Sequence, residues 1–314
     1  MHDERGLTEY FQLNTAPVQG VIVEKFLEQA RHVETQCLRD SYGNFTVVST
    51  RDCSLQRRNQ KLIEEAPAFN LPAKIETELV ENSRKLFAAV GFVGAGTCEF
   101  LYENGAVYFL EVNPRLQVEH TVSEEITGAD LVRAQLEIAA GGKLSEIPQT
   151  RGHSIELRIT SENPDANMMP TAGVITHLSW PLGNGVRVDT AIREGDAVGT
   201  EFDSMVAKII VTAASRSEAI ARAKRALREF NISGISTPVP LYAAILETPE
   251  FMSGMFSTRW LETEFLPKWS GQANNGSADM QTAARAAPLT RPSCWQMLQR
   301  ITLSQLKSTA NAAQ

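Results

Sequence analysis

The sequence of 314 residues predicts an α+β fold, in which short β-type segments alternate with a small number of helices. Three observations carry this prediction. Short apolar or alternating runs such as Phe45-Thr-Val-Val48 are typical of strands. The pair Asn104-Gly105 separates two such runs and indicates a hairpin. Residues 73–90 instead repeat their apolar side chains with helical spacing.

Composition limits the classes of function. Hydrophobic residues make up 43% of the chain, enough for a real core, and the net charge of −7 argues against nonspecific binding to nucleic acid or anionic membranes. Neither a secretory signal nor an apolar stretch long enough to span a bilayer is evident. We therefore expect a cytoplasmic protein that binds neither nucleic acid nor membranes. Its four cysteines lack metal-ligand spacing and are interpreted as free thiols: Cys37, Cys53, Cys98 and Cys294.

The predicted elements follow in order. Residues 1–18 are polar. The first part has one or two predicted helices, of which the first covers residues 73–90 and can be ended by Gly91. Its predicted strands lie at residues 21–24, 33–38, 45–48 and 96–101. The second part has one predicted helix, residues 216–230, with apolar side chains on one face and basic ones on the other, and strands at residues 153–159, 185–189 and 205–211. The composition after Trp269 is typical of a flexible linker.

The hairpin loop decides which side chains share a face. A two-residue loop would place Glu99 and Glu111 on opposite faces, because side chains alternate along each strand. A three-residue loop over residues 103–105 would pair Tyr102 with Ala106 and bring both glutamates to one face. We predict the three-residue loop.

This loop groups the side chains by chemistry. Asn113 joins Glu99 and Glu111, and two carboxylates with an amide oxygen suit a hard divalent cation such as Mg²⁺. The alternative is an exposed face with scattered acids. The opposite, apolar face is predicted to consist of Cys98, Phe100, Tyr108 and Leu110.

The segment after this strand carries further charge. Thr121-Val-Ser-Glu124 has the form of a capping box, so a helix is predicted from there to about Ala140. Arg115, Gln117 and Glu119 alternate in the connection before it and can point the same way. Together they could hold a small planar anion and deprotonate it. A structural ion pair between Arg115 and Glu119 is the alternative.

A series of motifs runs along the chain: Glu24-Lys-Phe-Leu27, Arg31-His-Val-Glu34, Arg51-Asp-Cys-Ser-Leu-Gln-Arg-Arg-Asn-Gln-Lys61, Gly94-Ala-Gly-Thr-Cys-Glu-Phe100, Glu111-Val-Asn-Pro-Arg-Leu-Gln-Val-Glu-His120, Arg151-Gly-His153, Gly185-Val-Arg-Val-Asp189 and Phe202-Asp-Ser-Met-Val-Ala-Lys208. With these motifs the sequence resembles the biotin carboxylase family, a branch of the ATP-grasp fold. The resemblance runs from about Val21 to Phe265, in the order and spacing of the family.

The resemblance implies a role for each matched residue. The segment that meets ATP would comprise Glu24, Lys25, Leu27, His32, Gln56 and Asn59, the last in place of a histidine found in many members. Mg²⁺ or Mn²⁺ would be held by Glu99, Glu111 and Asn113. The bicarbonate pocket would comprise Lys61, Arg115, Gln117 and the Val118 backbone. Glu119 would be the general base, and Arg187 would stabilise the biotin enolate.

The resemblance also implies the domain organisation. Residues 1–20 would be a remnant of the ATP-grasp lid, residues 21–148 the C-terminal part of a truncated ATP-grasp domain with an antiparallel sheet and flanking helices, and residues 149–268 the α/β biotin carboxylase C-terminal domain. Residues 269–314 would be a flexible linker and tail. The N-terminal domain and the glycine-rich lid of the family have no counterpart in this sequence.

The implied activity is ATP-dependent carboxylation of biotin with bicarbonate through carboxyphosphate, the first half-reaction of biotin-dependent carboxylases. Expected partners are a biotin carboxyl carrier protein or domain, a carboxyltransferase, the N-terminal half of a biotin carboxylase and a second copy of the chain in a homodimer. We expect the chain alone to be inactive. The alternative is a non-catalytic binding or assembly module derived from a biotin carboxylase.

Overall fold

A computed structural model describes residues 5, 6, 8 and 24–269 of the chain. The predicted lid remnant at 1–20 (apart from residues 5, 6 and 8), most of the predicted strand at 21–24, the tail after Trp269 and Cys294 lie outside the described residues. Residues 24–27 have no regular secondary structure.

One antiparallel sheet of eight strands organises the described chain, in the order β11-β13-β6-β3-β2-β1-β4-β5. The predicted α+β class is confirmed, and the sheet continues across the predicted domain boundary at residue 148. Its strands are β1 (Arg31–Arg39), β2 (Phe45–Arg57), β3 (Gln60–Ala66), β4 (Gly94–Glu103), β5 (Ala106–Asn113), β6 (His153–Thr160), β11 (Val186–Thr190) and β13 (Met205–Ala213).

Shorter elements complete the described fold. The small strands form three two-stranded pairs: β7 (Glu162–Asn163) with β8 (Met169–Pro170), β9 (Gly173–Val174) with β12 (Ala197–Val198), and β10 (His177–Ser179) with β14 (Asn231–Ser233). The α-helices are α2 (Ala73–Ala89), α3 (His120–Thr127), α4 (Leu131–Ala139), α5 (Arg216–Glu229), α6 (Val239–Ile245), α7 (Pro249–Ser253) and α8 (Leu266–Trp269).

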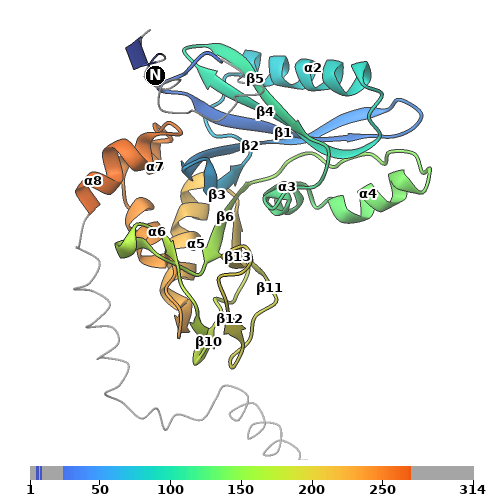
Figure 1. Ribbon diagram of the computed structural model, residues 1–314. Coiled ribbons are helices and arrows are strands. Elements are labelled where there is room, and N and C mark those ends of the chain that lie inside the picture. Colours follow the sequence, from blue (N-terminus) through green and yellow to red (C-terminus); the bar gives the residue numbers. More distant parts are fainter. Residues whose placement is uncertain (1–4, 7, 9–23, 270–314) are drawn as a thin grey trace, which may run out of the picture. The chain divides into compact units, whose positions relative to one another are not determined.

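Helices cover both faces of the sheet at its β4–β5 end (Figure 1). On one face, Leu79 and Phe87 of α2 pack with Val33 and Phe100. On the other, Leu131 and Ile138 of α4 pack with Leu38, Val48 and Ala95. Because side chains alternate along a strand, Glu34 and Glu99 face α3 and α4 while their neighbours Val33 and Phe100 face α2.

The hairpin between β4 and β5 differs from the prediction. Its turn has two residues, Asn104 (φ 51°) and Gly105 (φ 80°), and both adopt the left-handed conformation that two-residue hairpin turns favour. A register shift then leaves Leu110 as an extra residue, so that Glu99 pairs with Glu111 after all. The three-residue loop was wrong, but the shared face of the two glutamates is confirmed.

The two-residue turn and the register shift together change the apolar face of the hairpin. Val107 and Val112 pack on the core beside Phe100. Tyr108 and Leu110 were predicted to join this core, yet Leu110 lines the cavity described below and is 39% exposed. The two-residue turn pairs Tyr108 with Leu101, on the face opposite Phe100, and the bulge makes Leu110 an extra residue. Sequence alternation alone cannot reveal a bulge.

The predicted single helix from Thr121 to Ala140 is two helices. Gly128, at φ 70°, ends α3, and the side chain of Asp130 caps α4 by accepting a hydrogen bond from Arg133 N. Thr121 does not cap α3, because its hydroxyl donates to the buried carboxylate of Glu156. The packing of α3 against the sheet therefore overrides the capping-box pattern.

Candidate active site

A cavity of about 700 Å³ gathers most of the predicted site residues. We call it the central cavity. Of the predicted residues, those that line it are Lys25, Leu27, His32, Gln56, Asn59, Lys61, Glu99, Glu111, Asn113, Arg115, Gln117, Val118 and Glu119. Glu24 and Arg187 are not among its lining residues, whereas Arg158, which was not predicted, is.

A fully buried arginine anchors the floor of this cavity. Nε of Arg51 donates to Oε1 of Glu34 at 2.5 Å, and its other nitrogens donate to Gln36 on β1, Ser123 on α3 and Gln117 in the turn before it. Burial raises the pKa of Glu34, but Arg51 and Lys61 outweigh that effect and lower its pKa to about 2. Arg51 therefore attaches α3 and the preceding turn to the sheet.

Lys61 lies at the centre of three carboxylates. Its Nζ is 2.5 Å from Glu119 Oε1, 2.7 Å from Glu34 Oε2 and 3.3 Å from Glu99 Oε1. Burial disfavours the charged form of Lys61, but the acidic groups around it raise its pKa well above the ordinary value. Lys61 is therefore a permanent cation next to Glu119.

Glu119 is held by a second cation. Nη2 of Arg158 donates to Glu119 Oε2 at 2.9 Å, while Nε of Arg158 donates to Glu64 Oε1 at 2.6 Å. Glu119 is 1% exposed and points into the central cavity between Lys61 and Arg158. The alternative ion pair between Arg115 and Glu119 does not form. Instead, Arg115 donates to its neighbour's carbonyl oxygen, Leu116 O, and faces the cavity.

The sequence contained a signal for Arg158 that the prediction did not use. Glu156 and Arg158 alternate within the apolar strand β6, and charged residues inside strands need partners or a ligand. The same criterion singles out Glu34 and Arg51, in β1 and β2.

The predicted cation ligands are close together. Nδ2 of Asn113 donates to Glu99 Oε1 at 2.9 Å and to Glu111 Oε1 at 2.8 Å, so its amide lies between the two carboxylates. Rotation of this amide would present its oxygen, and the three oxygens would then suit Mg²⁺ or Mn²⁺. The donor set fits the implied cation.

Glu99 remains ionised in this setting. Its Oε2 lies 2.6 Å from His32 Nε2, and Gln117 Nε2 donates to its Oε1 at 2.6 Å. Burial raises the pKa of Glu99, but His32 and Lys61 outweigh it and lower that pKa to about 2. His32, Glu34 and Glu99 also bring ligand atoms within 4.8 Å of one another. Lys61 and Arg51 already neutralise Glu34, so this second trio is less suited to a metal.

The predicted nucleotide residues occupy one side of the cavity. Lys25 Nζ donates to the Tyr108 hydroxyl at 3.0 Å and lies 4.7 Å from the centre of its ring. Leu27 is buried, and Asn59 has a left-handed backbone, with φ 63°. The mixture of apolar and polar groups is typical of a small-molecule site.

Arg187 lies in a neighbouring acidic cluster. Its guanidinium donates to Asp189 at 2.8 Å and Glu124 at 2.9 Å, and lies 3.4 Å from Glu125. Arg187 is linked to the turn of Glu119 indirectly, through Lys208, whose Nζ donates to Val118 O at 2.7 Å and lies 3.7 Å from Asp189. Glu124 provides a second indirect link, because its Oε2 lies 3.9 Å from His120 Nε2.

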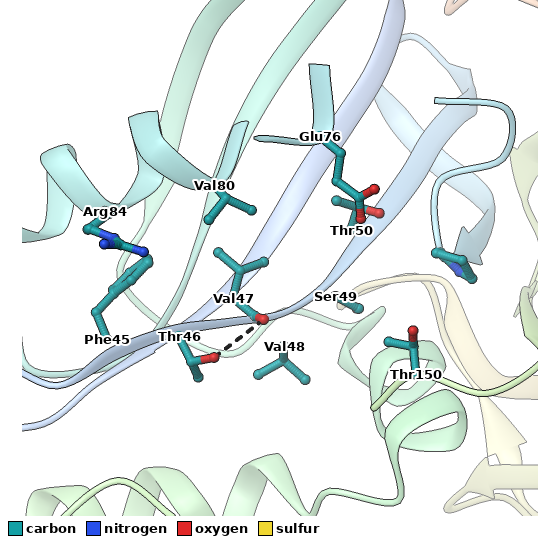
Figure 2. A pocket seen from close by; sticks show the side chains of 11 residues that line it. Phe45, Thr46, Val47, Val48, Ser49, Thr50, Glu76, Val80, Arg84 and Thr150 are labelled. Atoms are coloured by element: carbon teal, nitrogen blue, oxygen red, sulfur yellow. Dashed lines mark hydrogen bonds between the residues drawn. The ribbon is translucent and has the colours of Figure 1, made fainter. Parts of the chain in front are cut away.

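Another cavity, of about 330 Å³, lies beside the first half of β2 (Figure 2). Glu76, Val80 and Arg84 of α2 flank it on one side. It lacks the buried, converging charges of the central cavity, which therefore remains the candidate active site. Among the helices of the described residues, none is long and apolar enough to cross a membrane.

Two protein-family models match the chain and define its class. Residues 3–147 match the family model described as carbamoyl-phosphate synthase L chain, ATP binding domain, and residues 156–263 match the biotin carboxylase C-terminal domain. The two models together cover most of the chain, which therefore combines an ATP-grasp domain with a carboxylase C-terminal domain.

Individual proteins similar to the chain identify its family more specifically than the two models do. The chain is 47% identical over 249 residues to biotin carboxylase 1 of Bacillus subtilis, covering 78% of this chain and 55% of that protein. The biotin carboxylase of Campylobacter jejuni aligns with a TM-score of 0.73 and 42% identity, over 76% of this chain and 54% of that chain. The biotin carboxylase domain of Hydrogenobacter thermophilus 2-oxoglutarate carboxylase was solved with MgADP, ADP and bicarbonate. It aligns with a TM-score of 0.74 and 41% identity, over 76% of this chain and 54% of that chain. The chain belongs to the biotin carboxylase family and spans about half the length of these relatives.

Proposed function

We propose that the chain provides the bicarbonate and biotin side of a biotin carboxylase, which carboxylates carrier-bound biotin with bicarbonate and ATP. This proposal rests on one observation: Lys61 and Arg158 both contact Glu119 in the central cavity. Glu99 and Asn113 line the same cavity. A carboxylate between two fixed cations, beside a cation site, suits proton abstraction from an anion that then attacks a phosphate.

Bicarbonate would lie against Lys61, Arg115, Gln117 and the Val118 backbone. Glu119 takes its proton as the bicarbonate oxygen attacks the γ-phosphate of ATP, giving ADP and carboxyphosphate. Lys61 neutralises charge at the transferring group, as phosphoryl transfer requires. A bound Mg²⁺ or Mn²⁺, held by Glu99, Glu111 and Asn113, would supply further charge neutralisation.

Carboxyphosphate then breaks down to CO₂ and phosphate, and the phosphate removes the ureido proton of biotin. The deprotonated nitrogen attacks CO₂ while an arginine stabilises the enolate oxygen. We assign this last role to Arg158 rather than Arg187, because Arg158 lines the central cavity next to Glu119 and Arg187 does not.

Nucleotide contacts are proposed for Lys25, Leu27, His32, Gln56 and Asn59. Glu24 precedes this group in sequence, and its role rests on the resemblance alone. Catalysis would require the N-terminal half of a biotin carboxylase, and the complete assembly would include a homodimer, a biotin carrier and a carboxyltransferase.

The test is bicarbonate-dependent ATP hydrolysis stimulated by free biotin, measured after the chain is mixed with the separately expressed N-terminal half of the B. subtilis relative. We expect activity with the mixture and none with either part. Glu119→Gln should lower it roughly 10²–10⁴-fold, the typical contribution of a general base. Glu81→Gln, on the exposed surface of α2, is the matched control. A folded mixture that binds MgADP but never hydrolyses ATP would favour the assembly module instead.

A further inference from the structure

Two glutamates face each other inside the sheet next to the central cavity. Glu64 on β3 and Glu156 on β6 are directly paired across these strands, and both are 0% exposed. Side chains that are directly opposite in an antiparallel pair have Cβ atoms about 4.5–5.5 Å apart. Two ionised carboxylates at this separation and burial would repel each other strongly.

One oxygen of each carboxylate has a partner. Glu64 Oε1 accepts from Arg158 Nε, and Glu156 Oε2 accepts from the Thr121 hydroxyl and lies 3.8 Å from Lys208 Nζ. For Glu64 Oε2 and Glu156 Oε1, the described part of the chain offers no hydrogen-bond partner. Buried polar atoms without hydrogen-bond partners are energetically costly. A hydrogen on one of the two carboxyl groups would supply the missing donor, and its position cannot be seen from the non-hydrogen atoms.

We propose that Glu64 and Glu156 share one proton, carried on Glu156 Oε1 and donated to Glu64 Oε2, and that this pair positions Arg158 beside Glu119. A single proton would satisfy both unpartnered oxygens. The role of Arg158 rests on the proposed function, and Glu64 and Glu156 are positioning residues that act through it.

The surrounding charges decide which glutamate carries the proton. Glu64 faces the guanidinium of Arg158 directly, which favours its ionised form. Glu156 has no hydrogen bond from Arg158, and its ion pair with Lys208 is longer, 3.8 Å, and shared with Val118 O and Asp189. Glu156 is therefore the acid and Glu64 the carboxylate.

The other groups that face the pair are accounted for. Lys61 on β3 and Glu119 in the turn before α3 act on Glu64, and Thr121 on α3 and Arg158 on β6 act on Glu156. Burial and the charge of Glu64 raise the pKa of Tyr242 on α6. Burial raises the pKa of both glutamates, and the charge of Glu64 raises that of Glu156 further, to about 8.

Loss of the proton to solvent would change the position of Arg158. Glu64 and Glu156 would then both be carboxylates, and Arg158, adjacent to Glu156 through β6, would be attracted by both as well as by Glu119. The guanidinium would be drawn away from Glu119 towards the pair. While the pair holds one proton, between the pKa values of about 6 for Glu64 and about 8 for Glu156, Arg158 bridges Glu64 and Glu119 as it does in the structure.

The test is NMR of the full chain with ¹³C-labelled glutamate side chains, titrated with pH in the absence of nucleotide and bicarbonate. We expect two carboxyl carbons with midpoints above the ordinary value of 4.5, the higher of which disappears in Glu156→Gln. The same variant should move the Glu64 midpoint to lower pH. Glu64→Gln should remove the other signal, and Glu81→Gln should remove neither. Ordinary midpoints for both glutamates would overturn the proposal.

A second readout tests positioning rather than packing. The ¹⁵N resonance of Arg158 Nε, assigned with Arg158→Lys, should follow the higher midpoint in the wild-type chain and lose that pH dependence in Glu156→Gln. If the chemical shift of Arg158 Nε does not change with pH around the higher midpoint, the positioning role is overturned. Neither measurement requires carboxylation. If the chain shows these titrations but its mixture with the N-terminal half is inactive, the proposed function is contradicted while the shared proton stands.

Discussion

Glu99 and Glu111 lie directly opposite each other on β4 and β5, and Asn113 donates from Nδ2 to an oxygen of each. Like charges directly opposite in a sheet are destabilising. The amide relieves this repulsion only in part, whereas a divalent cation between the carboxylates would turn it into attraction. The bulge at Leu110 creates this arrangement and thereby the candidate cation site.

Removal of one carboxylate should weaken cation binding. Glu111 is exposed and its side chain contacts Asn113, so Glu111→Gln should leave the fold intact. We expect Mn²⁺ to bind at least tenfold more weakly, because loss of even an outer-shell partner costs about 10–100-fold in metal affinity. Titration of Mn²⁺ followed by electron paramagnetic resonance measures this, with Glu81→Gln as control. Equal affinity in both variants would exclude Glu111 as a ligand.

Arg51 should be essential for folding stability. Its guanidinium is fully buried and holds Glu34, Gln36, Ser123 and Gln117. Arg51→Met leaves Glu34 without its principal cation, and breaking a buried pair costs roughly 3–5 kcal/mol. Urea unfolding monitored by circular dichroism measures the loss. Arg84→Met, on the exposed face of α2, should change the unfolding free energy by less than about 1 kcal/mol.

The two candidate arginines for biotin can be separated by activity. In the reconstituted assay, Arg158→Gln should lower biotin-stimulated turnover by about 10²–10³-fold, the typical effect of losing one donor to a developing oxyanion. Arg187→Gln should retain turnover close to that of the wild type, because its side chain is held by Asp189 and Glu124 outside the cavity. The opposite ranking would restore Arg187 to the role implied by the sequence.

Stability should fall as pH rises through neutrality. The folded-state pKa of Glu156 is raised from its ordinary 4.5 to about 8, so its contribution is complete below pH 4.5 and is lost as pH rises through 8. Each unit of pKa difference corresponds to about 1.4 kcal/mol. Glu156→Gln should therefore flatten the pH dependence of the unfolding free energy between these values. Parallel curves for the variant and the wild type would contradict a raised pKa.

Acidic pH should act in the opposite sense. The pKa values of Glu34 and Glu99 are lowered to about 2, so their stabilisation is present above the ordinary value of 4.5 and is lost as pH falls through 2. Chemical unfolding at pH 7, 4 and 3 measures this. We expect the sharpest loss below pH 4 and a smaller loss in Glu99→Gln. Because Glu156 titrates in the opposite sense, the comparison is made in Glu156→Gln, and equal stability of that variant at pH 7 and 3 would contradict ionised carboxylates in the cavity.

Much of the fold was predictable because its signals are local. Alternating apolar runs predicted the main strands β1, β4, β6 and β13, and helical spacing predicted α2 and α5. The wrong predictions concern features that depend on tertiary packing. Nothing in the periodicity of β5 reveals the bulge at Leu110, and Gly128 ended α3 within a segment whose apolar pattern continues into α4.

The site divides in the same way. Residues within the family motifs, such as Glu99, Lys61 and Glu119, line one cavity, and their roles stay predictions. Arg158 and the pair of Glu64 and Glu156 were missed, because their meeting depends on β3 pairing with β6 across about ninety residues of chain. Sequence spacing cannot show such a contact, although charged residues inside apolar strands do indicate that buried partners or a ligand are present.

The crystal structure of this chain with MgADP and bicarbonate tests the central claim most directly. We predict density for bicarbonate against Lys61 and Arg115, within hydrogen-bonding distance of Glu119, and a cation on Glu99 and Glu111. Bicarbonate and cation bound away from the central cavity, for example beside Arg187, with Lys61 and Glu119 still paired as they are here, would contradict the account.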